Sequence, residues 1–365
     1  MEDGLPAAAL TTVLRDGGAG PLATLLRATV LTVAGEPLHG RDLVGAGAVS
    51  GRWRRLEADL ALGLALCDVS APGRAEVDAA LRAFRYARRL TSAQDMRRWL
   101  ARRELELGEL RAAIERELAR DGRHGAGPAH AADRARALAA LPAEAVLSGA
   151  LRECGWWLAD RLLAARRAPG GAPRTDVDEE RLRAVAAGEA RLLAVAALGE
   201  PAEERSARLR RILVADDAFA AQCAAALGEE AIARCLDAHR LAWVTFDLEG
   251  LRCAAPSVAA EAAMQLREDG IALHDVARAA GLEIARTRLL LEDGADAFRA
   301  VLAAAAAGEV VGPVEVEGRH EVWVVRRRAP PDMRDRVVAE RAASTVLAAD
   351  ADRRRAGRVR WHDRD

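Results

Sequence analysis

The clearest pattern in the chain is the alternation of apolar and polar residues on both sides of a glycine between Gly308 and Arg328. Such alternation predicts a β-hairpin with one buried face, because successive side chains of a strand point to opposite sides of a sheet. Counting by twos, His320, Val322 and Val324 share a face. A histidine that points where valines point is either a hydrogen-bonded packing residue or part of a ligand groove, and the pattern leaves both interpretations open.

The segment that precedes this hairpin alternates between strand and helix patterns. Residues 241–248 and 283–291 carry the β-branched and aromatic runs typical of strands. Residues 256–267, 273–280 and 295–307 carry helical patterns bounded by proline or glycine. The predicted order is therefore strand, helix, helix, strand, helix, strand, strand, which describes a small α+β domain.

Helical patterns dominate the remainder of the chain. A strand-turn unit over Val30–Leu38 interrupts a helical region at residues 1–120, and a second helical region spans residues 121–240. Stretches rich in glycine and proline at 121–128 and 169–173 predict linkers. The sequence therefore predicts a mainly α protein with a small C-terminal α+β domain.

Composition and charge narrow the function. The 54 basic residues meet 55 acidic residues, the net charge is -1, and no basic stripe with interleaved aromatic residues stands out, so nucleic-acid binding is not expected. Arginine supplies every basic side chain apart from histidine, because the chain contains no lysine, and alanine is abundant. This usage is typical of a GC-rich genome, so a high arginine content by itself says little about a site.

Other classes of protein and site are also disfavoured. No apolar run is long enough to span a bilayer, and the acidic start of the chain is unlike a secretory signal, so we expect a cytoplasmic protein without membrane contact. The five cysteines form no CxxC pair and indicate buried, reduced thiols. His124 and His130 lack acidic or cysteine partners at helical spacing, so we expect no metal site and no cofactor.

Two motifs of the C-terminal domain resemble the parvulin (PpiC-type) prolyl isomerases. The first is the alanine-rich stretch Ala259–Ala280, and the second, more specific, is Gly308–Val314 followed by Gly318-Arg319-His320. The N-terminal segments Thr32–Leu38 and Arg88–Trp99 look like the helical chaperone part of SurA-type proteins. Together these matches cover about half of the chain.

The resemblance implies a site with two facing histidines on central strands and a nearby cysteine or aspartate, which together stabilise a twisted X-Pro amide. His320 matches the histidine of the last strand and is the candidate catalytic residue. The first strand, Trp243–Leu248, contains no histidine, and the loop that would carry the acidic or thiol residue is shortened to Gly281–Ile284. Cys253 and Asp247 are possible substitutes, but a core thiol and a turn-forming carboxylate are the favoured interpretations.

The resemblance also implies a groove for a proline-containing peptide, with an apolar lining. We expect this lining to include Phe246, Leu273, Val322 and Val324. His274 is expected on the exposed side of its helix and is not a site residue.

The closing segment, residues 329–365, resembles the helix and short terminal strand that follow the hairpin in PpiC-related proteins of ribosomal peptide maturation. The implied architecture is a SurA-like helical region at 1–120, a helical region of unassigned role at 121–240, and a degenerate parvulin-like antiparallel sheet with flanking helices at 241–328.

The implied function is a peptide-binding, chaperone-like accessory protein whose isomerase activity is weak or lost. Its partners would be a precursor peptide or an unfolded polypeptide, together with peptide-modifying enzymes. Two alternatives remain: an active peptidyl-prolyl cis-trans isomerase, and a non-catalytic helical scaffold for assembly.

Overall fold

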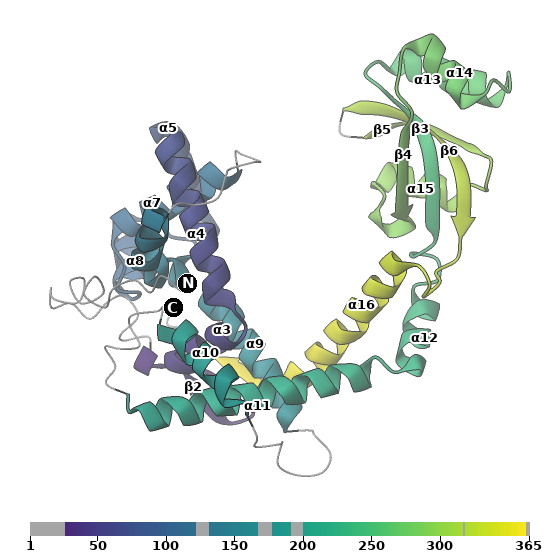
Figure 1. Ribbon diagram of the computed structural model, residues 1–365. Coiled ribbons are helices and arrows are strands. Elements are labelled where there is room, and N and C mark those ends of the chain that lie inside the picture. The colour runs from purple at the N-terminus through teal and green to yellow at the C-terminus, as the bar shows by residue number, and fades with distance from the viewer. Residues whose placement is uncertain (1–25, 122–130, 167–176, 191–199, 317, 363–365) are drawn as a thin grey trace. The chain divides into compact units, whose positions relative to one another are not determined.

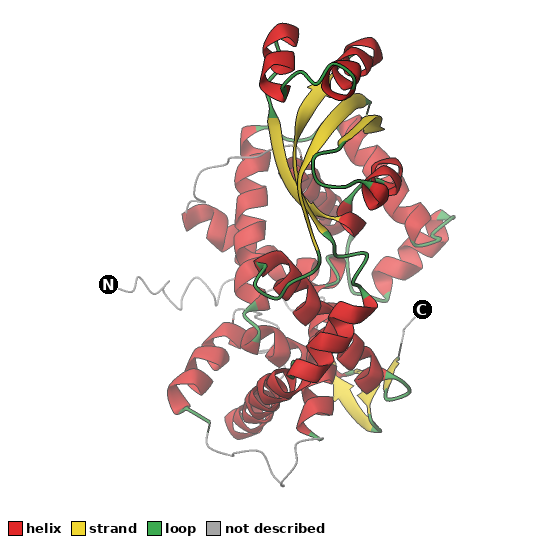
Figure 2. Cartoon of the chain, turned by 90° about the vertical axis from the view of Figure 1, so that its right-hand side faces the viewer, coloured by secondary structure: helices red, strands yellow, loops and turns green. Residues whose placement is uncertain are grey.

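The protein is mainly helical and contains two small antiparallel sheets, as the sequence predicts (Figures 1 and 2). The structure is a computed structural model, and it describes residues 26–121, 131–166, 177–190, 200–316 and 318–362. Most of the first predicted linker, residues 122–128, and all of the second, residues 169–173, lie outside the described residues. His124 and His130 lie outside them as well.

The chain divides into two compact units. Residues 1–222 and 351–365 form one, which we call the helical unit, and residues 223–350 form the other, the α/β unit. The observed division falls within the helical region predicted at 121–240 and not at its end.

The helical unit contains a three-stranded antiparallel sheet made from segments far apart in the sequence. Strands β1 (Thr29–Val33) and β2 (Glu36–His39) form a hairpin, and β7 (Val359–Trp361) pairs with the other side of β1. The hairpin turn uses Ala34 and Gly35, both with positive φ. The predicted strand-turn unit and the predicted terminal strand are both confirmed.

Helices make up the rest of the helical unit. Their bounds are α3 (Gly40–Val49), α4 (Arg52–Val69), α5 (Arg74–Ala87), α6 (Ala93–Ala101), α7 (Leu107–Asp121), α8 (Ala131–Leu147), α9 (Ala150–Ala165), α10 (Glu179–Ala190) and α11 (Ala202–Ala226), the last of which continues into the α/β unit. Helix α4 packs against α7 and α8, and α3 packs against α9 and α10 (Figure 1). The regions predicted at 1–120 and 121–240 therefore share one unit.

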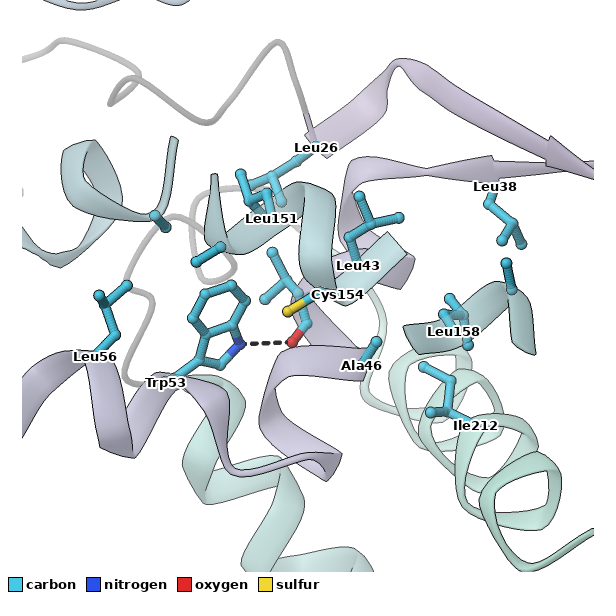
Figure 3. Close-up of a cluster of buried hydrophobic side chains, with 14 of the residues drawn as sticks. Leu26, Leu38, Leu43, Ala46, Trp53, Leu56, Leu151, Cys154, Leu158 and Ile212 are labelled. Atoms are coloured by element: carbon cyan, nitrogen blue, oxygen red, sulfur yellow. Dashed lines mark hydrogen bonds between the residues drawn. The ribbon is translucent and has the colours of Figure 1, made fainter. Parts of the chain in front are cut away.

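Trp53 lies at the centre of the main core of the helical unit (Figure 3). Its side chain is buried, and its indole N–H donates a 2.7 Å hydrogen bond to the backbone carbonyl of Val44. Helix α3 approaches the indole closely because residue 47 is glycine, where a Cβ atom would lie 2.2 Å from the ring. Leu56 and Cys154 pack in the same cluster.

Two arginine clusters tie helices of this unit together. Arg208 on α11 bonds the carboxylates of Glu189 and Glu200, each at 2.7 Å, and all three side chains are buried. Arg355, at the end of helix α16 (Arg336–Arg355), forms a bidentate pair with Asp160 on α9, with distances of 2.7 and 2.6 Å. Because removing one partner of such a pair strands a buried charge, both clusters fix the positions of these helices.

The α/β unit has the predicted order of elements. They are β3 (Thr245–Cys253), α13 (Pro256–Arg267), α14 (Leu273–Ala280), β4 (Ala285–Leu290), α15 (Asp296–Ala304), β5 (Val310–Val316) and β6 (Arg319–Ala329), and the antiparallel sheet has the order β4-β3-β6-β5. Strand β3 starts later than predicted because the backbone N–H groups of Trp243 and Val244 bond carbonyls of the preceding turn. The predicted hairpin is confirmed as β5 and β6.

Each face of this sheet has its own core. Helices α13 and α14 cover one face, where Leu251, Cys253 and Val322 are buried. Helix α15 lies against the other face, where Phe246 and Trp323 are buried. A smaller cluster joins helix α12 (Glu229–Ala238) and the predicted C-terminal helix, α16, to the strand ends.

The contact between Trp53 and α3 predicts different effects for two helical glycines. Gly47→Ala should lower the free energy of unfolding of the helical unit by about 1–3 kcal/mol, because the new methyl group overlaps the indole. Gly108→Ala in α7 meets no atom within 4 Å and should be neutral or stabilise by up to about 1 kcal/mol. Urea unfolding followed by circular dichroism measures both, and equal stabilities for the two variants would contradict the proposed packing.

Candidate functional site

Glu315, His320 and Cys253 form a row across three strands of the four-stranded sheet. His320 on β6 lies opposite Cys253 on β3 and opposite Glu315 on β5. Directly opposite residues of an antiparallel pair share a face, with Cβ atoms about 4.5–5.5 Å apart. The row lies on the face covered by α13 and α14, since Cys253 packs in that core.

The chemistry of this row is limited by burial and by missing contacts. Cys253 is 1% exposed, and burial raises the pKa of its thiol, so the sulfur stays protonated near neutral pH and is a poor nucleophile. The imidazole of His320 is half-buried and has no hydrogen-bond partner among the described residues. The row therefore lacks a group that would orient or activate the histidine.

Asp247 and His274 contact charged side chains of other residues and lie apart from His320. Asp247 faces two arginines, Arg288 on β4 at 3.4 Å and Arg327 on β6 at 4.0 Å, at the end of β3 away from His320. His274 is exposed, as predicted, and lies 3.2 Å from the carboxylate of Asp275. Neither is brought together with His320.

The four residues predicted to line a peptide groove are core residues on two different faces of the sheet. Leu273, Val322 and Val324 pack beneath α13 and α14, whereas Phe246 packs on the α15 face. All four are buried. They do not form a common groove, because their apolar surface is already used for packing within the unit.

A cavity of about 720 Å³ in the helical unit is a stronger candidate. Its walls are residues 88–104, which span α6 and the loops on both sides, the connection between α8 and α9, and the edge of the small sheet at β1 and β7. Among the described residues, six arginines and two carboxylates line it. The arginines are Arg88, Arg89, Arg98, Arg102, Arg103 and Arg152.

Helix α6 and its C-cap residue, Arg102, present two of these arginines because of the amphipathic pattern of the helix. Met96 and Leu100 are buried, and Arg98 and Arg102 lie one turn apart on the exposed side. A capping box fixes the start of the helix: the Ser92 hydroxyl accepts from the Asp95 N–H, and the Asp95 carboxylate accepts from the Ser92 hydroxyl and N–H. These hydrogen bonds lower the pKa of Asp95, so it remains ionised.

Aromatic rings hold several cavity arginines in place. The guanidinium of Arg103 lies 4.3 Å from the ring centroid of Trp99, and that of Arg152 lies 5.3 Å from Trp361. Trp99 in turn meets the edge of Phe84 at 5.3 Å. Stacking of this kind orients a guanidinium group, and Arg103 also donates a 3.3 Å hydrogen bond to the backbone carbonyl of Trp99.

A second cavity, of about 460 Å³, adjoins the first. Arg88, Leu147 and Ser148 line both cavities. Apolar side chains from α5, α7 and α8, such as Phe84 and Leu110, make up more than half of its lining, which also contains charged residues. The charged residues besides Arg88 are Glu117, Arg120, Asp121 and Glu144. The helical unit thus offers an arginine-rich space beside a more apolar one.

Sequence reasoning missed this site. From the sequence, the arginine content is attributed to genome composition, and Trp99 is named only as the end of the segment Arg88–Trp99 that looks like SurA-type proteins. A usable signal exists in the spacing of Arg98 and Arg102 next to the pair Arg88-Arg89. The contributions of Arg152 and Trp361, however, depend on tertiary contacts.

Metal and membrane sites find no support in the part of the chain that the structure describes. Those residues contain no group of three or more histidine, cysteine, aspartate or glutamate side chains arranged to hold a metal ion. Within the same residues no helix is both long and apolar enough to cross a membrane.

Comparison with known proteins assigns no relative. No protein-family model matches the chain, and no curated protein sequence matches it.

The burial of Cys253 predicts a low thiol reactivity. In the native protein near pH 8, iodoacetamide should modify Cys253 at least about tenfold more slowly than the half-buried Cys67 and Cys223, because its thiol is sealed in the core. Burial raises the pKa of the Cys67 thiol as well, so access of the reagent is what separates the two. Mass spectrometry of digested protein measures each rate, and the rates should converge in denaturant. Rapid native labelling of Cys253 would restore it as a candidate nucleophile.

Proposed function

We propose that this chain is a peptide-binding, chaperone-like accessory protein in which prolyl isomerase activity is weak or lost. The observation that carries the proposal is the 720 Å³ cavity of the helical unit, with its arginine and tryptophan lining and the apolar cavity beside it. Its volume falls in the range of ligand-binding pockets, about 300–1,000 Å³. An extended polypeptide fits such a site, because it offers carbonyl groups to guanidinium donors and side chains to the apolar space.

The state of the α/β unit supports the second part of the proposal. Its order of elements is the one that the sequence pattern predicts, and His320, which carries the parvulin resemblance, lies on the last strand of the sheet. The neighbouring thiol is sealed, and the predicted groove residues are core. On this proposal the α/β unit keeps a parvulin-like fold and has lost most of the isomerase site.

The biological setting follows from the resemblance to PpiC-related maturation proteins. We propose a cytoplasmic role in which the protein holds a ribosomally made precursor peptide, or an unfolded polypeptide, for peptide-modifying enzymes.

Binding of unstructured peptides tests the main proposal. Fluorescein-labelled peptides that contain bulky apolar residues should bind the full chain saturably, as measured by fluorescence anisotropy. Trp99→Ala should weaken binding by about tenfold, because it removes a large aromatic surface and releases Arg103. Tyr86→Ala is the matched control, since Tyr86 is 73% exposed and lies outside both cavities. Circular dichroism checks that both variants are folded, and equal losses for the two would refute binding in the cavity.

An active isomerase is the second candidate, and the position of the half-buried His320 between Cys253 and Glu315 on neighbouring strands favours it. A protease-coupled assay on proline peptides should give little or no rate above background for the wild-type chain. If a clear rate exists and His320→Ala lowers it about tenfold or more, this candidate replaces the loss of activity proposed above. His274→Ala serves as the control, because that histidine is exposed on α14.

A further inference from the structure

The charge of the cavity departs from the charge of the chain. Acidic and basic residues are nearly balanced overall, at 55 and 54. In the described lining of the cavity, six arginines face two carboxylates. If the cavity lining only reflected the composition of the chain, carboxylates and arginines would line it in about equal number. Elsewhere carboxylates do accompany buried arginines, as Glu189 and Glu200 accompany Arg208. The surplus is therefore local to this site.

Most of the cavity arginines lack a carboxylate partner. Among the described residues, Arg89, Arg98, Arg102 and Arg152 form no ion pair. Asp95, which lies in the same lining, is bonded to Ser92 in the helix cap; the charge of Arg98 helps to lower its pKa, but the two side chains form no ion pair. Because guanidinium groups bind carboxylates through paired hydrogen bonds, the uncompensated set favours an anionic ligand.

The surroundings favour a peptide over a nucleic acid. Single-stranded nucleic acids need open aromatic faces on which bases stack. Here the ring of Trp99 is in contact with Phe84 and Arg103, and the ring of Trp361 is in contact with Trp156 and Arg152.

The adjoining apolar cavity adds a second requirement. It shares Arg88, Leu147 and Ser148 with the charged cavity, and the apolar part of its lining comes from α5, α7 and α8. Its carboxylates are Glu117, Asp121 and Glu144, the last of which is paired with Arg116. An occupant that fills both spaces must carry negative charge and, next to it, a bulky apolar group. An extended polypeptide can present both on neighbouring residues.

From these observations we infer that the cavity selects an acidic segment of polypeptide that is followed or preceded by a bulky apolar residue. The inference rests on the proposed peptide-binding function and specifies the class of peptide. Carboxylates of the peptide bind Arg98, Arg102 and Arg152, and the apolar side chain enters the space beyond Arg88.

Three labelled peptides of equal length and with leucines at the same positions test the charge preference. The remaining positions are glutamate and aspartate in the first, serine and glutamine in the second, and lysine in the third. Anisotropy titrations of the full chain should show the acidic peptide binding about tenfold or more tightly than the neutral one, and the basic peptide binding weakest. Raising the salt concentration should reduce the preference, because exposed charges are screened.

Charge reversal within the cavity supplies the matched variants. Arg98→Glu with Arg102→Glu should weaken binding of the acidic peptide by about tenfold or more and change binding of the neutral peptide by less than about threefold. The control variant, Arg82→Glu with Arg97→Glu, changes the net charge of the protein by the same amount. Its two sites are exposed residues of α5 and α6 outside the cavity lining, so both peptide affinities should stay within about twofold of the wild type. Replacing the leucines of the acidic peptide by serine should also weaken binding, since the apolar cavity then stays unfilled.

The outcomes separate the two levels of the hypothesis. If the neutral and acidic peptides bind equally, or if both pairs of reversals act alike, the charge preference is wrong while peptide binding stands. If none of the peptides binds, the proposed function itself is wrong. If an oligothymidine competitor displaces the acidic peptide at lower concentration than the unlabelled peptide does, the site is a nucleic-acid site and the inference is overturned.

Discussion

The pairing of β7 with β1 is the constraint on which the helical unit depends. Residues 359–361 return to the first described strand, and the His362 N–H donates to the carbonyl of Val30 at 2.9 Å. This pairing places Trp361 against α9, where residue 155 must be glycine because a Cβ atom there would lie 2.4 Å from the indole. The same tryptophan then forms part of the cavity wall and orients Arg152. A short strand from the end of the chain thus completes both a core and a candidate binding site.

Arginine has two physical roles in this chain. Buried guanidinium groups such as those of Arg116 and Arg208 are matched by carboxylates, because an unpaired charge inside a protein is costly. Four arginines of the cavity lining are exposed and form no ion pair among the described residues, and an unmatched charge costs little where solvent reaches it. They are Arg89, Arg98, Arg102 and Arg152. The separation between matched and unmatched arginines distinguishes a structural network from a binding surface, even when one residue type supplies both.

In the α/β unit, packing uses the residues that the sequence suggests for a site. Its last strand carries His320, and the register places a thiol and a carboxylate on either side of it. The thiol is covered by α13 and α14, so its low dielectric surroundings favour the neutral form. The apolar residues that a peptide groove would need instead hold these helices and α15 to the sheet.

The sequence by itself determined the local elements. Apolar periodicity with proline or glycine at the ends located α13 and α14, and alternation located the β5-β6 hairpin, because these signals depend on neighbouring residues. Tertiary structure alone decided which faces the strands present. Val322 and Val324 on β6 lie on the sheet face beneath α13 and α14. Simple alternation would place Arg328 on that face too, but the register of β3 against β6 shifts between Asp247 and Leu248. Arg328 therefore lies opposite Phe246 and bonds the carbonyl of Ala305 on the α15 side. The cavity could not be predicted from the sequence either. Its lining comes from segments as far apart as Thr29 and His362, which only folding brings together.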